Sequence, residues 1–92
     1  MTDLNQINQQ RIQRMREMLE SELAPSSLEI EDESHLHAGH VGAKTGKGHF
    51  YLNIKSSAFE GVSPVKKHQL IYQALGEMME TDIHALRISM SG

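Results

Sequence analysis

The sequence predicts an α+β domain in which two helices cover one face of a three-stranded mixed sheet. Its 92 residues suffice for one domain with a modest core, so we expect residues 1–92 to form a single domain. Apolar residues recur at helical spacing over 4–23 and again over 64–80. Three other segments alternate apolar and polar residues, as strands do. The resulting order, α-β-β-α-β, is satisfied by a two-layer domain.

Residues 4–23 are predicted to form an amphipathic helix. Its polar face carries Gln, Arg and Glu, and its apolar residues keep roughly helical spacing: Leu4, Ile7, Ile12, Met15, Met18, Leu19 and Leu23. Thr2 or Asp3 is in position to cap the start of the helix. Pro25 follows the last apolar residue and ends the helix.

The first two strands are predicted on either side of a long loop. Leu28 and Ile30 alternate with glutamates, which indicates a short strand with one buried face. Residues 32–48 are rich in His and Gly and contain little that can enter a core, so we expect a long loop there. Residues 49–55 alternate again and place three apolar residues on one side: Phe50, Leu52 and Ile54. We expect the two strands to pair antiparallel, because no helix separates them.

A turn followed by the second helix is predicted over 56–80. Ser63 is the expected N-cap and Pro64 the first helical residue. The apolar stripe of this helix is predicted to comprise Val65, Ile71, Tyr72, Leu75, Met78 and Met79. Gly76 costs roughly 1 kcal/mol relative to Ala in a helix interior. Residues 83–90 are predicted as the last strand, which a helical crossover can join in parallel to its neighbour.

Composition argues against several classes of function. A formal net charge of −3 opposes a general electrostatic hold on nucleic acid. Cysteine is absent, so this chain supplies neither a disulfide nor a thiolate ligand. No apolar run approaches membrane-spanning length and MTDLNQINQQ lacks the apolar core of a signal peptide, so we expect a cytoplasmic protein that does not contact membranes. We expect no catalytic residue and no enzyme activity, because no catalytic motif is present.

The segment HLHAGH carries three histidines: His35, His37 and His40. Neutral imidazole is a common ligand of zinc, copper, nickel and iron. These three residues therefore form a candidate site for a divalent metal, although their spacing matches no standard zinc module. The alternative is a solvated loop whose histidines titrate near pH ~6.5. His49 and His84, which fall in predicted strands, are expected to be structural.

His68 shares the apolar side of the second predicted helix with Val65 and Tyr72. It is either a partly buried residue bonded to a neighbour or a ligand at the edge of the helix. Lys66 and Lys67 precede it, although cations at a helix N-terminus oppose the macrodipole. These lysines form either a solvated first turn or a contact for an acidic partner or phosphates.

Three stretches together resemble the BolA family: LEIEDESHLHAGH, HFYLNIKSSAFEGVSPVKKHQLIYQAL and IHALRI. With the first helix, the resemblance covers nearly the whole chain. Its most specific pattern, F-x-G-x-x-x-x-x-[RK]-H-x-x-[IV]-Y, is met by Phe59, Gly61, Lys67, His68, Ile71 and Tyr72. The family often has Arg where this chain has Lys67, which keeps the charge but loses the bidentate fork.

The resemblance implies a fold similar to the type II KH fold, although this chain lacks the G-x-x-G loop with which KH domains hold RNA. It also implies a monothiol glutaredoxin as partner, with a 2Fe–2S cluster shared between the two proteins and glutathione. The residues that match the family's ligand positions are His68 and, from the loop, His37, with His40 as the alternative. We expect no cofactor on the isolated chain. This chain has no cysteine thiolate, so we expect its contribution to such a cluster to be imidazole nitrogen.

The resemblance also implies an alternative function, that of a DNA-binding transcriptional regulator. The turn at 56–61 and the helix after it resemble the edge of a helix-turn-helix unit. In that interpretation Lys55, Lys66 and Lys67 contact phosphates, and Gln69 reaches the edges of bases.

Overall fold

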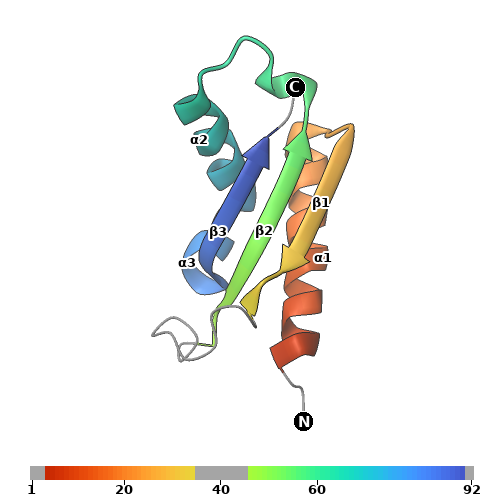
Figure 1. Cartoon of the computed structure of the whole chain (residues 1–92), viewed down its shortest axis with the longest axis vertical. Coiled ribbons are helices and arrows are strands. Elements are labelled where there is room, and N and C mark those ends of the chain that lie inside the picture. Colours follow the sequence, from red (N-terminus) through yellow and green to blue (C-terminus); the bar gives the residue numbers. More distant parts are fainter. Residues whose placement is uncertain (1–3, 35–45, 91–92) are drawn as a thin grey trace.

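The computed structural model describes residues 4–34 and 46–90, and the predicted order of elements is confirmed (Figure 1). The elements are α1 (Leu4–Leu23), β1 (Ser27–Asp32), β2 (Gly48–Lys55), the 3-10 turn η3 (Ser57–Phe59), α2 (Pro64–Leu75), α3 (Met78–Thr81) and β3 (Ile83–Met90). No helix among these residues is long and apolar enough to cross a membrane.

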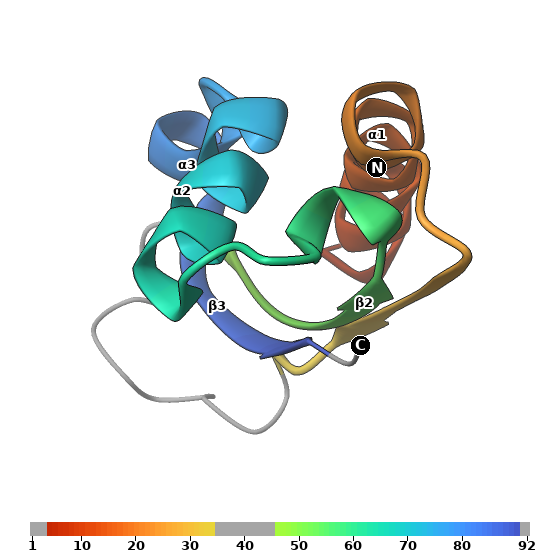
Figure 2. The same cartoon turned by 90° about the horizontal axis from the view of Figure 1, so that it is seen from above.

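The sheet is mixed, as predicted, and has the order β1-β2-β3. β1 pairs antiparallel with β2, so that Ile30 lies opposite Leu52. β2 pairs parallel with β3, so that Leu52 also lies opposite Ile88. The helices lie on one side of the sheet (Figure 2). This placement explains the alternation in β2, whose apolar residues face the helices while Tyr51 and Asn53 are only half-buried.

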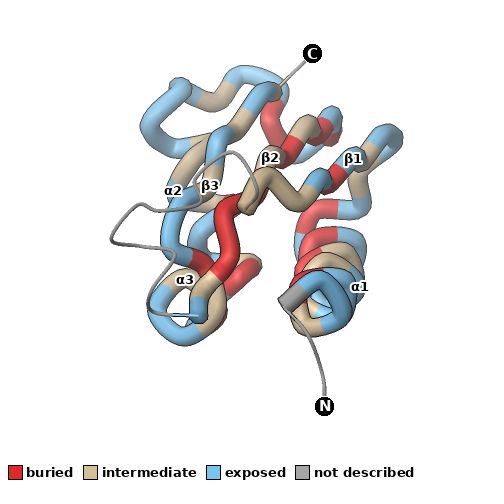
Figure 3. Tube along the Cα trace, turned by 60° about the horizontal axis from the view of Figure 1, so that its bottom comes forward, coloured by how far each residue is buried: buried red, intermediate tan, exposed pale blue. Residues whose placement is uncertain are grey.

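The core lies between β2 and the helices (Figure 3). Its fully buried side chains include Met15 and Leu19 from α1 and Ile71 and Leu75 from α2, together with Phe50, Leu52, Ile54, Phe59 and Met78. The predicted caps of α2 are also confirmed: Ser63 is the N-cap, and its Oγ accepts a hydrogen bond from the amide of Lys66 at 3.3 Å.

Two details of the second helix were predicted wrongly. The helix does not continue to residue 80: α2 ends at Leu75, and Gly76 has φ +56° in a conformation that glycine favours. Val65 and Tyr72 do not belong to the buried stripe, since they are 69% and 41% exposed. They share one side of α2, which is rotated by about 100° from the side of the helix that enters the core.

Candidate functional site

A polar network surrounds the end of the sheet at which β2 and β3 begin. We call this end, comprising 32–34, 46–49 and 82–84, the histidine end because it carries His49 and His84. Asn8 of α1 is 1% exposed and lies at its centre. Its amide nitrogen donates to Asp32 Oδ2 at 3.2 Å and to Ser34 Oγ at 3.1 Å. The end of β1 is thereby fixed to α1.

Arg11 joins the same network to β2 and β3. Its Nε donates to Asp82 Oδ2 at 3.0 Å, and its Nη1 donates to Asn8 Oδ1 at 2.9 Å and to the Gly46 carbonyl at 2.8 Å. Burial would by itself raise the pKa of Asp82, but hydrogen bonds from Thr81 and Arg11 outweigh it and hold that pKa below its ordinary value. One arginine thus holds the chain before β2 and the chain before β3 together.

A second arginine acts on the open face of the sheet. Arg87 forms a bidentate pair with Glu33, with Nε–Oε1 at 3.2 Å and Nη2–Oε2 at 2.7 Å. Its guanidinium also lies 4.0 Å from the centroid of the Tyr51 ring, within cation–π range. The hydrogen bond with Glu33 raises the pKa of Arg87 above its ordinary value. The residue after β1 is therefore tied to β3 as well.

His49 and His84 lie against each other, with ring centroids 4.9 Å apart. His49 is 4% exposed, in keeping with the structural role expected for it, and its amide donates to Ser34 Oγ at 3.1 Å. His84 is exposed, so a role in the core does not explain why a histidine stands at this position. The amide of Gly48 donates to the Asp82 carbonyl at 2.9 Å, which fixes the start of β3 beside His49. The sequence signal that could have pointed to His84 is HAL, residues 84–86, because it lies in IHALRI, one of the three stretches that resemble the BolA family.

His68 lies elsewhere, in the first half of α2. Its Nδ1 lies 2.8 Å from the carbonyl of Pro64. Because a carbonyl can only accept, Nδ1 carries the hydrogen, and in the neutral ring Nε2 keeps a free lone pair. Histidines that bind metals commonly have this arrangement, with one nitrogen bonded to a carbonyl. Both interpretations of His68 therefore remain: it is half-buried and bonded to a neighbour, and it is able to ligate a metal.

The three loop histidines, His35, His37 and His40, lie outside the described residues. Within 4–34 and 46–90, no three His, Asp or Glu side chains are placed to hold a metal ion by themselves. The pairing of His68 with a loop histidine stays a prediction. Among the described histidines, contact joins His49 to His84, and His68 contacts the ring of Tyr72 at 6.2 Å between centroids.

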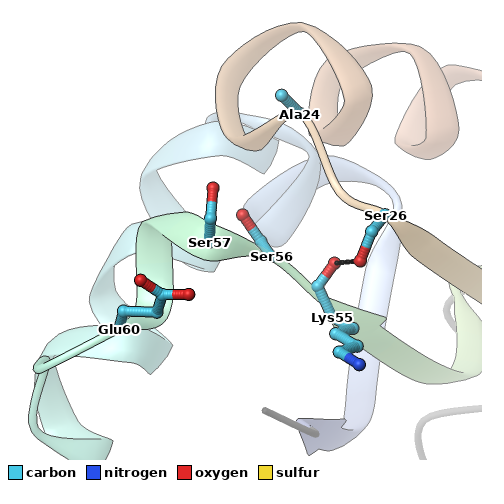
Figure 4. Close-up of a pocket in the computed structure, with 6 residues that line it drawn as sticks. All are labelled: Ala24, Ser26, Lys55, Ser56, Ser57 and Glu60. Atoms are coloured by element: carbon cyan, nitrogen blue, oxygen red, sulfur yellow. Dashed lines mark hydrogen bonds between the residues drawn. The ribbon is translucent and has the colours of Figure 1, made fainter.

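The predicted basic contacts fall into two places. Lys66 and Gln69 are exposed on α2 and Lys67 is half-buried, whereas Lys55 ends β2. Lys55 lines a hollow of about 210 Å³ together with Ala24, Ser26, Ser56, Ser57 and Glu60 (Figure 4). The hydroxyl of Ser56 in this hollow is already bonded to the Leu23 carbonyl. The hollow is smaller than ordinary ligand pockets, and no histidine lines it.

Comparison with known proteins identifies the family. The family described as BolA-like protein matches residues 19–91. The chain belongs to this BolA-like family. Protein BOLA1, chloroplastic, from Arabidopsis thaliana is 48% identical over 81 residues, which are 85% of this chain and 51% of the relative. Mouse BolA-like protein 1 is 42% identical over 74 residues, 80% of this chain and 52% of the relative. The BolA-like chain thus spans about half the length of these two relatives.

Solved BolA structures agree with the fold. The BolA domain of SufE1 from Arabidopsis thaliana matches with a TM-score of 0.76 and 47% identity, covering 88% of this chain and 90% of that domain. BolA1 from the same plant matches with a TM-score of 0.73 and 46% identity, covering 86% and 87%. The family resemblance and the fold class predicted from the sequence are both confirmed.

Proposed function

We propose that this BolA-like chain binds a monothiol glutaredoxin and supplies imidazole ligands to a 2Fe–2S cluster that the two proteins share with glutathione. Its role is that of an accessory protein in iron–sulfur trafficking or iron regulation, without catalysis by its own residues. The absence of cysteine supports the proposal, because the chain has histidines to offer a cluster and no thiolate. We further propose that residues 1–92 act as one domain.

The observation that carries the proposal is the exposed imidazole of His84 at the histidine end. It lies beside the buried His49, in a segment that the hydrogen bonds of Arg11 hold in place. The last described residue before HLHAGH is Ser34, and it bonds to His49 directly. An imidazole at the start of β3 therefore lies near the chain that leads to the loop histidines. We prefer His84 as the fixed ligand for this reason, with His37 or His40 as the loop ligand.

His68 is the other candidate for the fixed ligand, and it is the one that the sequence predicted. Its bond to the Pro64 carbonyl leaves Nε2 as the donor in the neutral ring. Its position in the fold counts against it. β2 and β3 are parallel, so the crossover leaves one end of the sheet and returns to the other. His68 lies early in that crossover, toward the far end from His84 (Figure 1).

Imidazole ligation has two consequences. Replacing a thiolate by a neutral ring reduces the negative charge around a 2Fe–2S cluster and raises its reduction potential. It also makes binding depend on pH, because only a deprotonated nitrogen binds iron. The cluster supplies the redox chemistry when bound, and this chain's residues determine how readily it is accepted and released.

Visible circular dichroism of a cluster-loaded monothiol glutaredoxin tests the proposal. Adding the wild-type chain is expected to change the spectrum, because imidazole replaces part of the original ligand set. His84→Ala should abolish most of that change, while His68→Ala should leave it nearly intact. The reverse result would reassign the fixed ligand to His68. A spectrum identical to that of the glutaredoxin alone, under anaerobic conditions, would refute cluster sharing.

A second candidate function is DNA binding. A relative from Haemophilus influenzae that carries the name DNA-binding transcriptional regulator BolA is 38% identical over 87 residues, 95% of this chain and 75% of the relative. The exposed side of α2 offers Lys66 and Gln69, and α2 contains no acidic residue. The test is the salt dependence of affinity for duplex DNA. Each lysine that contacts a phosphate adds about 1 to the slope of log affinity against log salt, and Lys66→Gln should remove that share.

A further inference from the structure

We propose that Arg11 and Arg87 are positioning residues of the histidine end, and that together they fix His84 for iron binding. Their two ion pairs bracket this histidine along the chain: Arg11 pairs with Asp82, and Arg87 itself pairs with Glu33. The role in iron binding rests on the function proposed above. The positioning of the ring by itself does not, and it is tested separately below.

Arg11 acts from the helix-covered side of the sheet. Its side chain is 12% exposed and that of Asp82 is 17% exposed, so the pair is largely shielded from water. Its guanidinium has acceptors on three parts of the chain: Asn8 on α1, Gly46 before β2 and Asp82 before β3. A shielded charge with all its partners in place resists displacement, because a shift would leave a charge uncompensated. Arg11 therefore sets where β3 begins relative to β2.

Arg87 acts from the open face. It lies on β3, three residues after His84, and its bidentate bond reaches Glu33, the residue after β1. Stacking on Tyr51 restricts the guanidinium further. Because the Arg87 side chain is 64% exposed, solvent screens this pair, and it should contribute less than Arg11 does. The two arginines hold the start of β3 from opposite sides of the sheet.

Arg14 provides a matched control within the same molecule. Its Nη1 lies 3.6 Å from the same Asp82 oxygen, but its side chain is 54% exposed. Among the described residues, Arg14 shares Asp82 with Arg11 but not the hydrogen bonds that Arg11 donates to Asn8 and Gly46. Arg11→Gln and Arg14→Gln therefore remove the same charge near the same carboxylate, and only the first removes the bonds that join three parts of the chain.

The first measurement uses the isolated chain and does not need a cluster. Imidazole proton and nitrogen shifts of His49 and His84 report their contact at 4.9 Å, because each ring lies in the ring current of the other. Arg11→Gln is expected to move these shifts, Arg87→Gln to move them less, and Arg14→Gln to leave them unchanged. Ile71→Val, which destabilises the core within α2, should lower the melting temperature and leave the shifts in place.

The second measurement uses the chain with a cluster-loaded monothiol glutaredoxin. Loss of a residue that orients a metal ligand typically weakens metal binding about 10- to 100-fold. Arg11→Gln should therefore raise the concentration of chain needed to produce the shared-cluster spectrum about 10-fold. Arg14→Gln and Ile71→Val should change it less than about 2-fold, since neither variant releases β3.

Three outcomes are informative. If Arg11→Gln folds and both its imidazole shifts and its titration match the wild type, the inference is wrong. If Arg11→Gln moves the imidazole shifts but neither the wild type nor any variant alters the glutaredoxin spectrum, the positioning role is correct and the proposed function fails. Should Arg11→Gln not fold, Arg11→Lys keeps the charge but cannot reach all three acceptors. Lysine must then move the imidazole shifts, and wild-type shifts in Arg11→Lys would overturn the inference.

Discussion

Within residues 4–34 and 46–90, two places present an accessible histidine, and they differ in how firmly they are held. At the histidine end, a buried amide and two arginines tie α1, β1, β2 and β3 together around His84. In the first half of α2, the hydrogen bond that His68 makes with a described residue stays within its own helix, to the Pro64 carbonyl. Around it, Val65 and Tyr72 project into solvent and Lys66 has no acidic residue in the same helix to pair with.

This difference separates two kinds of surface. A metal ligand works best when the surrounding residues hold it in place before the metal arrives. A contact surface for another macromolecule more often shows exposed apolar side chains and unpaired charges. This comparison supports the proposed iron site at the histidine end, and it favours the α2 end as a surface for contact with a partner. The following predictions test the contrast, from the largest expected effect to the smallest.

Gly48→Ala should destabilise the histidine end most. A methyl group at this position would collide with the ring of Phe50 and would lie 2.9 Å from Asn8 Oδ1. Both neighbours are almost fully buried, so neither can move freely. We expect a loss of about 3 kcal/mol in the free energy of unfolding, measured by urea denaturation. A loss below about 1 kcal/mol would mean that this end of the sheet is less tightly packed than described.

Gly76→Ala should destabilise the α2 end less. The new methyl group would meet nothing closer than 4.0 Å, so the cost comes only from forcing φ +56° on alanine. Strain of this kind is worth about 1–2 kcal/mol. Thermal and urea denaturation measure it. An alanine variant as stable as the wild type would indicate that α2 and α3 can join into the longer helix that the sequence predicted.

The helix boundaries show what sequence could and could not predict. Ser63 and Pro64 gave the start of α2 correctly, because capping depends on local chemistry. The end of α2 depended on the chain's need to turn toward β3, which places Gly76 at positive φ and is not visible in apolar spacing. Val65 and Tyr72 matched helical spacing, but only the packing against the sheet decides which side of a helix is covered.

The candidate site depends on contacts between distant parts of the chain, which spacing does not show. The resemblance pointed to His68 as a ligand, and that assignment stays a prediction beside the proposed His84. His84 was predicted to lie in a strand and to have a structural role. The alternation of apolar and polar residues does not reveal that it stays exposed beside His49. Arg11 and Asn8 gave no sequence signal, because their partners lie far away in the chain, up to Asp82.

Asp82→Asn should show a pH dependence that is specific to the histidine end. The pKa of Asp82 is lowered in the folded chain, so its charge stabilises the fold above its ordinary pKa of 3.8, and this stabilisation is lost as the pH falls through the folded value. The variant should therefore be less stable than the wild type by about 1 kcal/mol near neutral pH. The difference should shrink below about pH 4. A difference that does not vary with pH would show that Asp82 acts through shape alone.

Val65→Ser should have the smallest effect. This side chain is 69% exposed and contributes little to the core, so the free energy of unfolding should change by less than about 0.5 kcal/mol. Thermal denaturation is sufficient to measure it. A cost above about 1 kcal/mol would show that the exposed side of α2 supports the fold, and would weaken the distinction between the two ends.

Pulsed electron paramagnetic resonance of the reduced, shared cluster tests the central claim most directly. The BolA-like chain would be labelled with ¹⁵N in its histidines only and combined with unlabelled monothiol glutaredoxin. We predict strong ¹⁵N couplings in the wild type, with one coupling lost in His84→Ala and none lost in His68→Ala. A cluster spectrum without any ¹⁵N coupling would contradict the claim that this chain supplies nitrogen ligands.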